Sequence, residues 1–227
     1  MDKEAMYKLS YGLFVLTAKE NEKDNGCIIN TVTQVTTEPN RITIAVNKQN
    51  YTHDMIVNTG EFNVSVLSQN SKFETYKHWG FQSGANVDKT EDITFSRAGN
   101  GIIYIEDETN AYISGKVISS IDLGTHTLFI ADVTDCKNLT NDESVTYSYY
   151  QKNIKPAPQQ KKEGYICTVC GYIYEGEVLP DDFICPWCKH PASDFEHPAC
   201  KGREGKLHYR KGFFPVRQGL RGIRRLP

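Results

Sequence analysis

The sequence predicts a mainly β protein, built as a closed or split β-barrel followed by a small cysteine-rich module. Three observations support this prediction. Short segments rich in β-branched residues, many alternating apolar with polar side chains, recur through residues 1–150. Few helical stretches interrupt them, which favours a barrel over an α/β fold. Four of the seven cysteines then fall into two Cys-x-x-Cys pairs close to one another.

The individual strands are separated by Gly, Asn, Asp and Pro, which mark turns. We expect strands at residues 13–18, 27–35, 42–46, 62–67, 102–105, 111–118 and 128–133. Helices are expected at residues 3–9, 51–58 and 71–79. This order of many short strands and few helices is what a barrel of about 150 residues requires.

Composition excludes several classes of protein. The chain has 227 residues, of which 24% are charged and 39% apolar, with 26 basic and 28 acidic side chains. These values argue against a fibre, a disordered acidic protein and a nucleic-acid binder. No run approaches the roughly 20 apolar residues of a membrane helix, and residues 1–9 lack the apolar core of a signal peptide. We therefore expect a cytoplasmic protein with neither nucleic acid nor membrane as a partner.

Charge and composition divide the chain into four parts. Residues 1–150 form the predicted barrel, and residues 151–163, with two prolines and almost no apolar side chain, read as a partly extended linker of up to about 40 Å. The cysteine module follows at residues 164–196. Residues 197–227 carry nine basic side chains and one acidic one, without a helical or strand period, and are expected to be disordered.

The cysteine pairs predict a metal site. Cys167 and Cys170 form one pair, and Cys185 and Cys188 form the other. Four thiolates without histidine favour zinc or iron in tetrahedral geometry. Four aromatic residues are expected to shield the site and to form the core of so small a domain: Tyr172, Tyr174, Trp187 and Phe195.

These motifs, Cys-Thr-Val-Cys-Gly-Tyr-Ile-Tyr at 167–174 and Cys-Pro-Trp-Cys at 185–188 together with residues 192–196, closely resemble rubredoxin. The resemblance implies a one-electron iron centre, with structural zinc as the alternative. Two features depart from the family. Only 14 residues separate Cys170 from Cys185, about half the usual interval, and Lys189 stands where the family generally has Gly. A non-glycine residue in a left-handed conformation there costs about 1–2 kcal/mol.

An anion site is predicted in the barrel. The segment from Asn47 to Thr52 places Lys48 and hydroxyl groups at the start of a predicted helix, where backbone N–H groups favour a phosphate. The alternative is that Asn and Thr serve as ordinary caps and Lys48 as an ordinary surface charge.

The order of these segments, with Phe62-Asn-Val-Ser-Val-Leu67, Trp79-Gly-Phe-Gln-Ser-Gly84 and Gly124-Thr-His-Thr-Leu-Phe-Ile130, resembles the flavin reductase-like FMN-binding split-barrel family. The resemblance implies a homodimer that binds FMN near the subunit interface. It places one group of residues against the isoalloxazine ring: Asn30, Thr31, Thr33, Gln34, Val35 and Thr36. A second group is implied to hold the ribityl phosphate: Asn47, Lys48, Asn50, Tyr51 and Thr52.

Three more residues match the family's flavin site. Ser83 and Lys89 match a loop near the flavin in some members. His126 matches a histidine that borders the flavin and the nicotinamide, and the resemblance makes it the catalytic residue. Thr125 replaces the usual Asp of that motif. A packed core histidine is the alternative for His126.

The two resemblances together are those of the high-molecular-weight rubredoxins, fusions of a flavin reductase with a rubredoxin. This family implies electrons passing from NAD(P)H through FMN to iron and on to a redox protein, such as a flavodiiron oxygen or nitric oxide reductase. No Gly-x-Gly-x-x-Gly run follows a predicted strand, so NAD(P)H would dock transiently at the flavin. Cys27 and Cys136 are expected to be buried and without a redox role.

Two other functions remain open. The chain could be a flavin reductase that releases reduced flavin, with a structural zinc ribbon as a docking module. It could also be a non-enzymatic regulator that binds flavin or metal. The acidic body and the lack of a basic, aromatic stripe disfavour the regulator.

Overall fold

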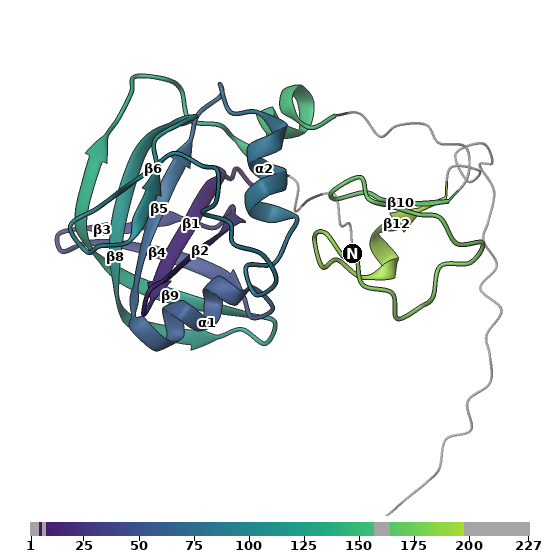
Figure 1. The fold of residues 1–227 in the computed structure, drawn as a ribbon, viewed down its shortest axis with the longest axis horizontal. Helices are drawn as coiled ribbons and strands as arrows, with labels where there is room; N and C mark the ends of the chain where they lie inside the picture. Colours follow the sequence, from purple (N-terminus) through teal and green to yellow (C-terminus); the bar gives the residue numbers. More distant parts are fainter. Residues whose placement is uncertain (1–4, 6–7, 157–163, 198–227) are drawn as a thin grey trace, which may run out of the picture.

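Residues 5, 8–156 and 164–197 are described by the structure, a computed structural model. Most of the predicted helix at 3–9, half of the predicted linker and the basic tail from 198 onwards lie outside the described residues. The barrel is a seven-stranded antiparallel sheet in the order β2-β1-β5-β8-β9-β4-β3 (Figure 1). Its strands are β1 (Phe14–Glu20), β2 (Lys23–Ile29), β3 (Thr33–Thr37), β4 (Asn40–Asn47), β5 (Glu61–Leu67), β8 (Thr109–Asp122) and β9 (His126–Asn138).

The barrel is split between β2 and β3, the two edges of the sheet. The sequence predicts one strand at 27–35, and this prediction is wrong because the chain leaves β2 at Ile29 and enters β3 at Thr33. Thr31 lies in this crossing, and its hydroxyl donates to the carbonyl of Ala45 at 2.7 Å and accepts from the Ala45 amide at 3.2 Å. The Thr31 side chain thus forms the hydrogen bonds to the β4 backbone that a continuous strand would otherwise form.

The main core lies inside the barrel and under helix α1 (Tyr51–Thr59), which packs against β1 and β2. Met55 and Ile56 of α1 are fully buried there, with Phe62 at the centre. Gly115 of β8 leaves room for the Phe62 ring, since a Cβ at this position would lie 2.4 Å from it. Strands β8 and β9 form a hairpin longer than predicted, with β-bulges next to Ser114 and Val117.

A second core cluster lies under helix α2 (Phe73–Gly80), beside the short strands β6 (Phe95–Arg97) and β7 (Ile103–Ile105). The short helix α3 (Tyr147–Tyr149) continues into a π-helix (Tyr150–Ile154). Tyr150 is buried and its ring lies 4.4 Å from that of Tyr76. The first residues of the predicted linker are therefore ordered, because Tyr150 and Ile154 pack into this cluster.

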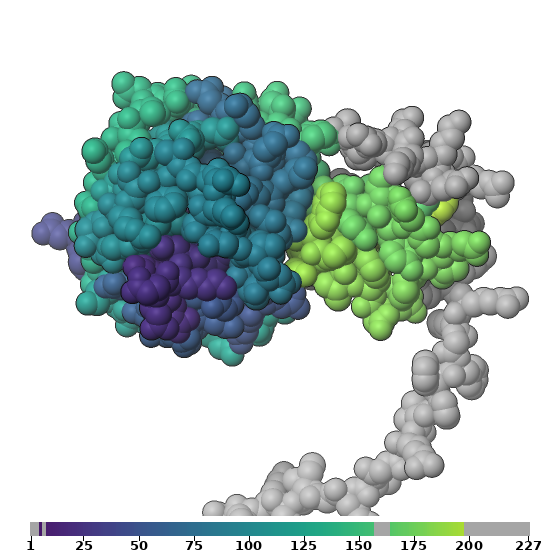
Figure 2. Space-filling model, in the orientation of Figure 1, coloured from purple at the N-terminus to yellow at the C-terminus, as the bar shows by residue number. Residues whose placement is uncertain are grey.

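The cysteine module is a small three-stranded sheet, β11-β10-β12, with bounds Tyr165–Cys167 (β10), Ile173–Tyr174 (β11) and Phe195–Glu196 (β12). A 3-10 turn at Ala192–Asp194 leads into β12. The module rests against the side of the barrel that carries α2 (Figures 1 and 2).

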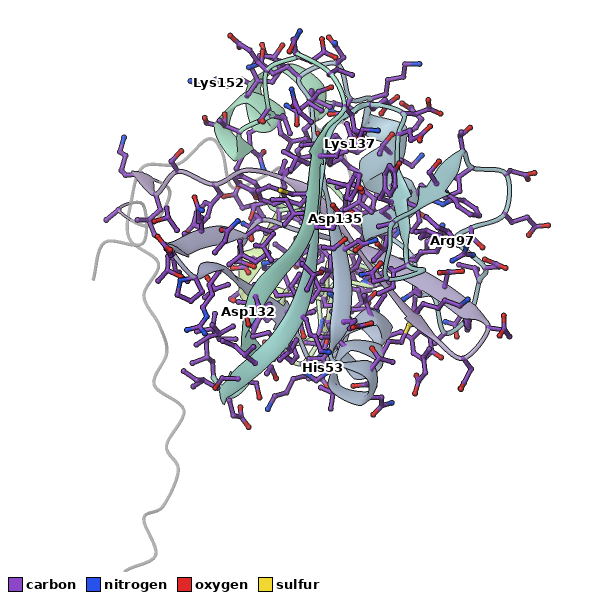
Figure 3. All side chains as sticks on the ribbon, turned by 90° about the vertical axis from the view of Figure 1, so that its left-hand side faces the viewer. His53, Arg97, Asp132, Asp135, Lys137 and Lys152 are labelled. Carbon is purple, nitrogen blue, oxygen red and sulfur yellow. The ribbon has the colours of Figure 1, made fainter. Side chains whose placement is uncertain are left out.

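The opposite face of the barrel is charged. Asp132, Asp135 and Lys137 follow one another along β9 on the side turned away from the module (Figure 3). Cys136 lies between them and is exposed, so its predicted burial is wrong. No helix within the described residues has both the length and the apolar character needed to cross a membrane.

Candidate functional site

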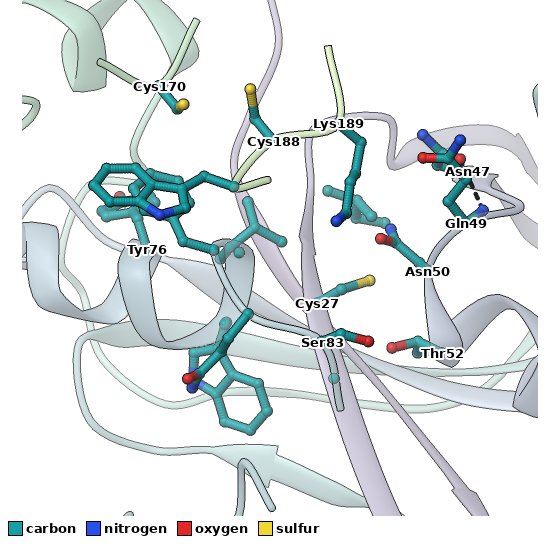
Figure 4. A pocket seen from close by; sticks show the side chains of 18 of the residues that line it. Cys27, Asn47, Gln49, Asn50, Thr52, Tyr76, Ser83, Cys170, Cys188 and Lys189 are labelled. Carbon is teal, nitrogen blue, oxygen red and sulfur yellow. Dashed lines mark hydrogen bonds between the residues drawn. The ribbon is translucent and has the colours of Figure 1, made fainter. Parts of the chain in front are cut away.

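A cavity of about 290 Å³ lies where the barrel meets the cysteine module. This volume is close to the lower end of the range for small-molecule pockets, about 300–1,000 Å³. The barrel contributes the end of β2, the crossing to β3, the end of β4, the start of α1 and the loop after α2. The module contributes its two Cys-x-x-Cys turns, at residues 169–170 and 186–190. The cavity thus belongs to both domains (Figure 4).

Asn25 on β2 lines the cavity and carries an acceptor without a partner. Its Nδ2 donates to the Thr52 hydroxyl at 2.9 Å, whereas its Oδ1 has no partner within the described residues. The residue is only 2% exposed. An unsatisfied buried carbonyl is costly in a folded protein, and this one is covered by Gly84, where an added Cβ would lie 1.9 Å from it.

Lys89 is buried at the wall of the same cavity. Its Nζ donates to the carbonyls of Gly26 at 2.8 Å and Trp79 at 2.9 Å. Burial lowers the pKa of Lys89 to about 8, against a smaller opposing effect of Cys27. Burial likewise raises the pKa of the Cys27 thiol, which the Thr52 hydroxyl partly offsets. Lys89 therefore ties α2 to β2 and brings a positive charge close to the cavity.

The start of α1 opens towards the cavity without a cap. Asn50 occupies the N-cap position in an extended conformation, but no side chain of the described residues caps the helix. Asn47 turns towards its own loop, where its Oδ1 accepts from the Gln49 amide at 2.9 Å. The His53 amide donates to the Asn50 carbonyl at 2.9 Å, so the helix dipole and the amides before His53 make this end of α1 a favourable place for an anion.

His126 begins β9 and is partly buried beside the cavity. Its Nδ1 lies 2.9 Å from the Thr125 hydroxyl, so Thr125 takes the hydrogen-bonding position that an Asp would otherwise fill. Burial, and then the proximity of His190 of the module, lowers the pKa of His126. The imidazole is therefore neutral at pH 7.

Most of the barrel residues predicted to bind the cofactor line this cavity, and His126 lies among them. Those that line it are Asn30, Thr31, Asn47, Asn50, Tyr51, Thr52, Ser83, Lys89 and His126. Those outside it are Thr33, Gln34, Val35, Thr36 and Lys48.

The residues outside the cavity have other surroundings. Strand β3 is an exposed edge, where Gln34 donates to Asn40 at 2.9 Å and Thr36 donates to the Pro39 carbonyl at 2.6 Å. Lys48 forms an ion pair with Asp122 at 2.7 Å. The lysine expected at the phosphate is thus held by a carboxylate on β8 instead.

The four cysteines of the module form a closed cluster. Their Sγ atoms lie within 4.8 Å of one another, with Cys167 to Cys188 and Cys170 to Cys185 both at 3.5 Å. A tetrahedral ion with metal–sulfur bonds of about 2.3 Å needs sulfurs about 3.8 Å apart, which these positions approach. Hydrogen bonds from neighbouring thiols lower the pKa of Cys167 well below its usual range. The arrangement fits one metal ion held by four thiolates.

Each Cys-x-x-Cys turn closes in the same way. The amides of Gly171 and Lys189 donate to the carbonyls of Cys167 and Cys185, both at 2.9 Å. Both residues have positive φ, 81° for Gly171 and 62° for Lys189. The predicted left-handed conformation of Lys189 is confirmed.

Among the described residues, Phe81 and Lys155 join the barrel to the module, and Phe81 also packs against the buried cysteines. The rings of Phe81 and Trp187 stack with centroids 5.3 Å apart and planes 13° apart. Lys155, at the end of the π-helix, donates to the carbonyls of Thr168 and Val169 in the first cysteine turn. Burial lowers the pKa of Lys155. In this position Cys170 and Cys188 line the cavity (Figure 4).

Comparison with known families agrees with this architecture. The family model for the flavin reductase like domain matches residues 6–158, and that for the rubrerythrin, rubredoxin-like domain matches residues 165–196. The chain belongs to the flavin reductase-like family. It is 34% identical to the high molecular weight rubredoxin of Moorella thermoacetica, over 86% of this chain and 99% of that protein.

Two further relatives match the flavin reductase-like domain. The ferric-chelate reductase (NAD(P)H) of Archaeoglobus fulgidus is 36% identical over 66% of this chain and 89% of its own. The solved structure of the flavin reductase PheA2 in its native state has a TM-score of 0.55 at 27% identity, covering 64% of this chain and 93% of that one. The chain is therefore an oxidoreductase with a flavin site in its first domain and an iron site in its second.

The cavity fits a flavin by its own chemistry. Asn25 and Asn30, which line it, carry amide groups of the kind that bond the polar edge of an isoalloxazine ring. The uncapped start of α1 suits a phosphate, and no residue lining the cavity among those described is acidic.

Sequence reasoning assigned no role at this site to Asn25, Trp79 or Phe81, all of which line the cavity. Asn25 carried a usable signal: it shares a strand face with Cys27 and Ile29, both buried, so it is a polar residue on an inward face. Phe81 carried none, because its partner Trp187 is more than 100 positions away in sequence.

Proposed function

We propose that this chain carries electrons from NAD(P)H, through FMN bound in the cavity, to iron held by the four cysteines, and on to a second redox protein. The observation that carries the proposal is that one cavity is lined both by the flavin reductase-like domain and by two thiols of the metal cluster, Cys170 and Cys188. A flavin in this cavity, the electron donor, therefore lies next to two cysteine ligands of the metal, the electron acceptor, in the same chain.

The cofactors supply complementary chemistry. A flavin takes up a hydride, two electrons and one proton, and gives electrons up singly, while the ferric centre accepts one electron to become ferrous. The protein's part is to hold the donor and acceptor close and to exclude water between them. The Phe81–Trp187 stack and Lys155 serve this by fixing the metal cluster over the cavity.

In this proposal, different residues of the cavity bind different parts of the flavin. Asn25, Asn30 and Thr31 bind the ring, while Asn47, Asn50, Tyr51 and Thr52 lie around the phosphate at the start of α1. Neutral His126 borders the site where the nicotinamide approaches, and Ser83 and Lys89 close the side formed by the loop after α2. Thr33, Gln34, Val35, Thr36 and Lys48 have no part in it within one chain.

A homodimer is part of the proposal. Four large apolar side chains remain exposed on β3 and on the β8–β9 hairpin, each at least 44% accessible: Val35, Ile118, Ile121 and Leu123. In the proposed dimer, a second copy covers these exposed apolar side chains. We place this dimer in the cytoplasm, where the free thiols of Cys27 and Cys136 remain reduced.

The acceptor is proposed to be a redox protein with a basic docking face, such as a flavodiiron oxygen or nitric oxide reductase. Residues 164–197 carry six acidic side chains and one lysine. This negative charge around the metal would steer a positively charged partner.

Absorption spectra and metal analysis of the purified protein test the proposal. Flavin bands superimposed on a ferric–thiolate envelope, with both lost on reduction by NADH, are expected. Flavin bands alone, with one zinc per chain, would favour instead a flavin reductase that releases its product and carries a structural ribbon.

A further inference from the structure

Lys189 stands out in the cysteine module because its backbone is strained. It is a non-glycine residue with φ of 62°, at the position where the first cysteine turn has Gly171. This conformation costs about 1–2 kcal/mol that a glycine would avoid. Within the described residues its side chain donates to its own turn, from Nζ to the Pro186 carbonyl at 3.2 Å, which leaves two N–H groups for another partner.

Lys189 lines the cavity, while its Nζ also donates to Pro186 of its own turn. It lines the same cavity as Asn47, Gln49, Asn50 and Thr52 of the barrel. Figure 4 shows it extending from the module ribbon beside Cys188 towards Asn50. Lys189 of the module therefore shares this cavity with the start of α1 in the barrel.

The start of α1 lacks a cation of its own. Lys48, which follows Asn47 in sequence, is paired with Asp122 at 2.7 Å and lies outside the cavity. Lys89 is buried and gives two of its protons to the carbonyls of Gly26 and Trp79. Among the described residues that line the cavity, Lys189 is the other lysine, and no carboxylate accompanies it.

We infer that Lys189 binds the phosphate of the flavin mononucleotide, so that a residue of the metal module completes the flavin site of the barrel. The inference rests on the proposed function, in which the cavity holds FMN with its phosphate at α1. Two features of the cavity support an anion here, the uncapped helix start and a lining without acidic side chains among the described residues. Flavin binding and docking of the module then stabilise each other, since each contributes to the same ion pair.

Binding of FMN and of riboflavin to the full-length, metal-loaded protein tests this directly, because riboflavin lacks only the phosphate. Lys189→Gly is expected to weaken FMN about tenfold and to leave riboflavin unchanged. Lys189→Arg keeps the charge and should restore most of the affinity. Glycine suits the left-handed conformation, so the Gly variant should fold and bind metal as the wild type does.

The matched control is Lys77→Ala, which removes one exposed positive charge from α2, outside the cavity. It should change neither affinity. Equal effects of Lys189→Gly on FMN and riboflavin, or no effect on either, would overturn the inference. A rise in the KM for NADH with an unchanged ratio of FMN to riboflavin affinity would also overturn it, and would assign the lysine to the donor's phosphates. Failure of the wild type to bind either flavin would refute the proposed flavin site itself.

Discussion

At the scale of single residues, the site depends on groups whose bonding is incomplete in the protein alone. Two buried side-chain oxygens lack partners within the described residues, Asn25 Oδ1 in the cavity and Ser114 Oγ in the sheet. Only Asn25 lines the cavity. In the proposed site Asn25 binds the flavin ring, whereas Ser114 has no ligand to bind.

Asn25→Ala is expected to weaken FMN and riboflavin equally, about fivefold, because one hydrogen bond to the ring contributes about 1 kcal/mol. Ser114→Ala should leave both affinities unchanged. Isothermal titration calorimetry measures the affinity of each of the two variants for FMN and for riboflavin. A loss confined to FMN in the Asn25 variant would mean that this residue faces the phosphate and not the ring.

Lys155 is expected to raise the reduction potential of the metal. Its ammonium group is held at the first cysteine turn by the Thr168 and Val169 carbonyls, and it favours the more negative, reduced cluster. Lys155→Met should lower the potential by about 50 mV, roughly 1 kcal/mol for one electron. Lys152→Met, three residues earlier on the exposed side of the π-helix (Figure 3), is the control. Equal potentials in the wild type and the Lys155 variant, by redox titration of the visible bands, would contradict the assigned role.

The residue types of the metal site could be predicted from the sequence, because spacing alone brings four thiols to one ion. The phosphate site could be predicted only in part. Asn47 to Thr52 lie near the cavity as expected, yet which lysine reaches it depends on tertiary contacts: Asp122, on a distant strand, engages Lys48, while Lys189 arrives from another domain.

At the scale of elements, the junction between α2 and β2 is held by Lys89, whose charge is costly to bury. Its pKa falls to about 8 in the folded protein, from an ordinary value of 10.5. Between these two values the unfolded chain binds more protons than the folded one, so stability rises with pH. The free-energy cost of burying the Lys89 charge is fully present below pH 8, and it falls as the pH rises above 8 and the lysine loses its proton.

We expect the free energy of unfolding to increase by about 1 kcal/mol from pH 7 to pH 9, and Lys89→Met to abolish this increase. The raised pKa of the Cys27 thiol opposes the gain, but mainly above pH 9. Urea unfolding followed by circular dichroism at the two pH values measures the difference. A pH dependence that is the same in both proteins would show that Lys89 titrates normally.

Most elements were predictable from local sequence, and the exceptions have physical causes. The β-branched run at 27–35 gives no local sign of a break, because the break comes from Thr31 bonding to Ala45 of another strand. The lengths of β8 and β9 were underestimated because their outer ends, at Ile118–Asp122 and Asp135–Asn138, are exposed and lack a buried face to set a pattern.

At the scale of the whole molecule, the metal module is held over the cavity by few contacts. The Phe81–Trp187 stack is the main apolar one. Such a pair contributes about 0.5–1.5 kcal/mol beyond its buried area.

Phe81→Leu, which keeps an apolar side chain but loses the stacking, should therefore slow electron transfer from flavin to metal about fivefold. The metal content should not change, because Phe81 packs against the cysteine cluster but is not one of the four ligands. Flash reduction of the flavin, followed at the metal's absorbance, measures the rate. An unchanged rate would mean that the stack has no part in positioning the module.

The central claim is that electrons pass between the two sites within one chain, and anaerobic rapid mixing of the oxidised protein with NADH tests it most directly. The account predicts that the flavin bands bleach first and that the ferric–thiolate bands then bleach with a first-order rate constant independent of protein concentration. Flavin bleaching without loss of the metal bands, or a metal phase whose rate rises in proportion to protein concentration, would contradict it.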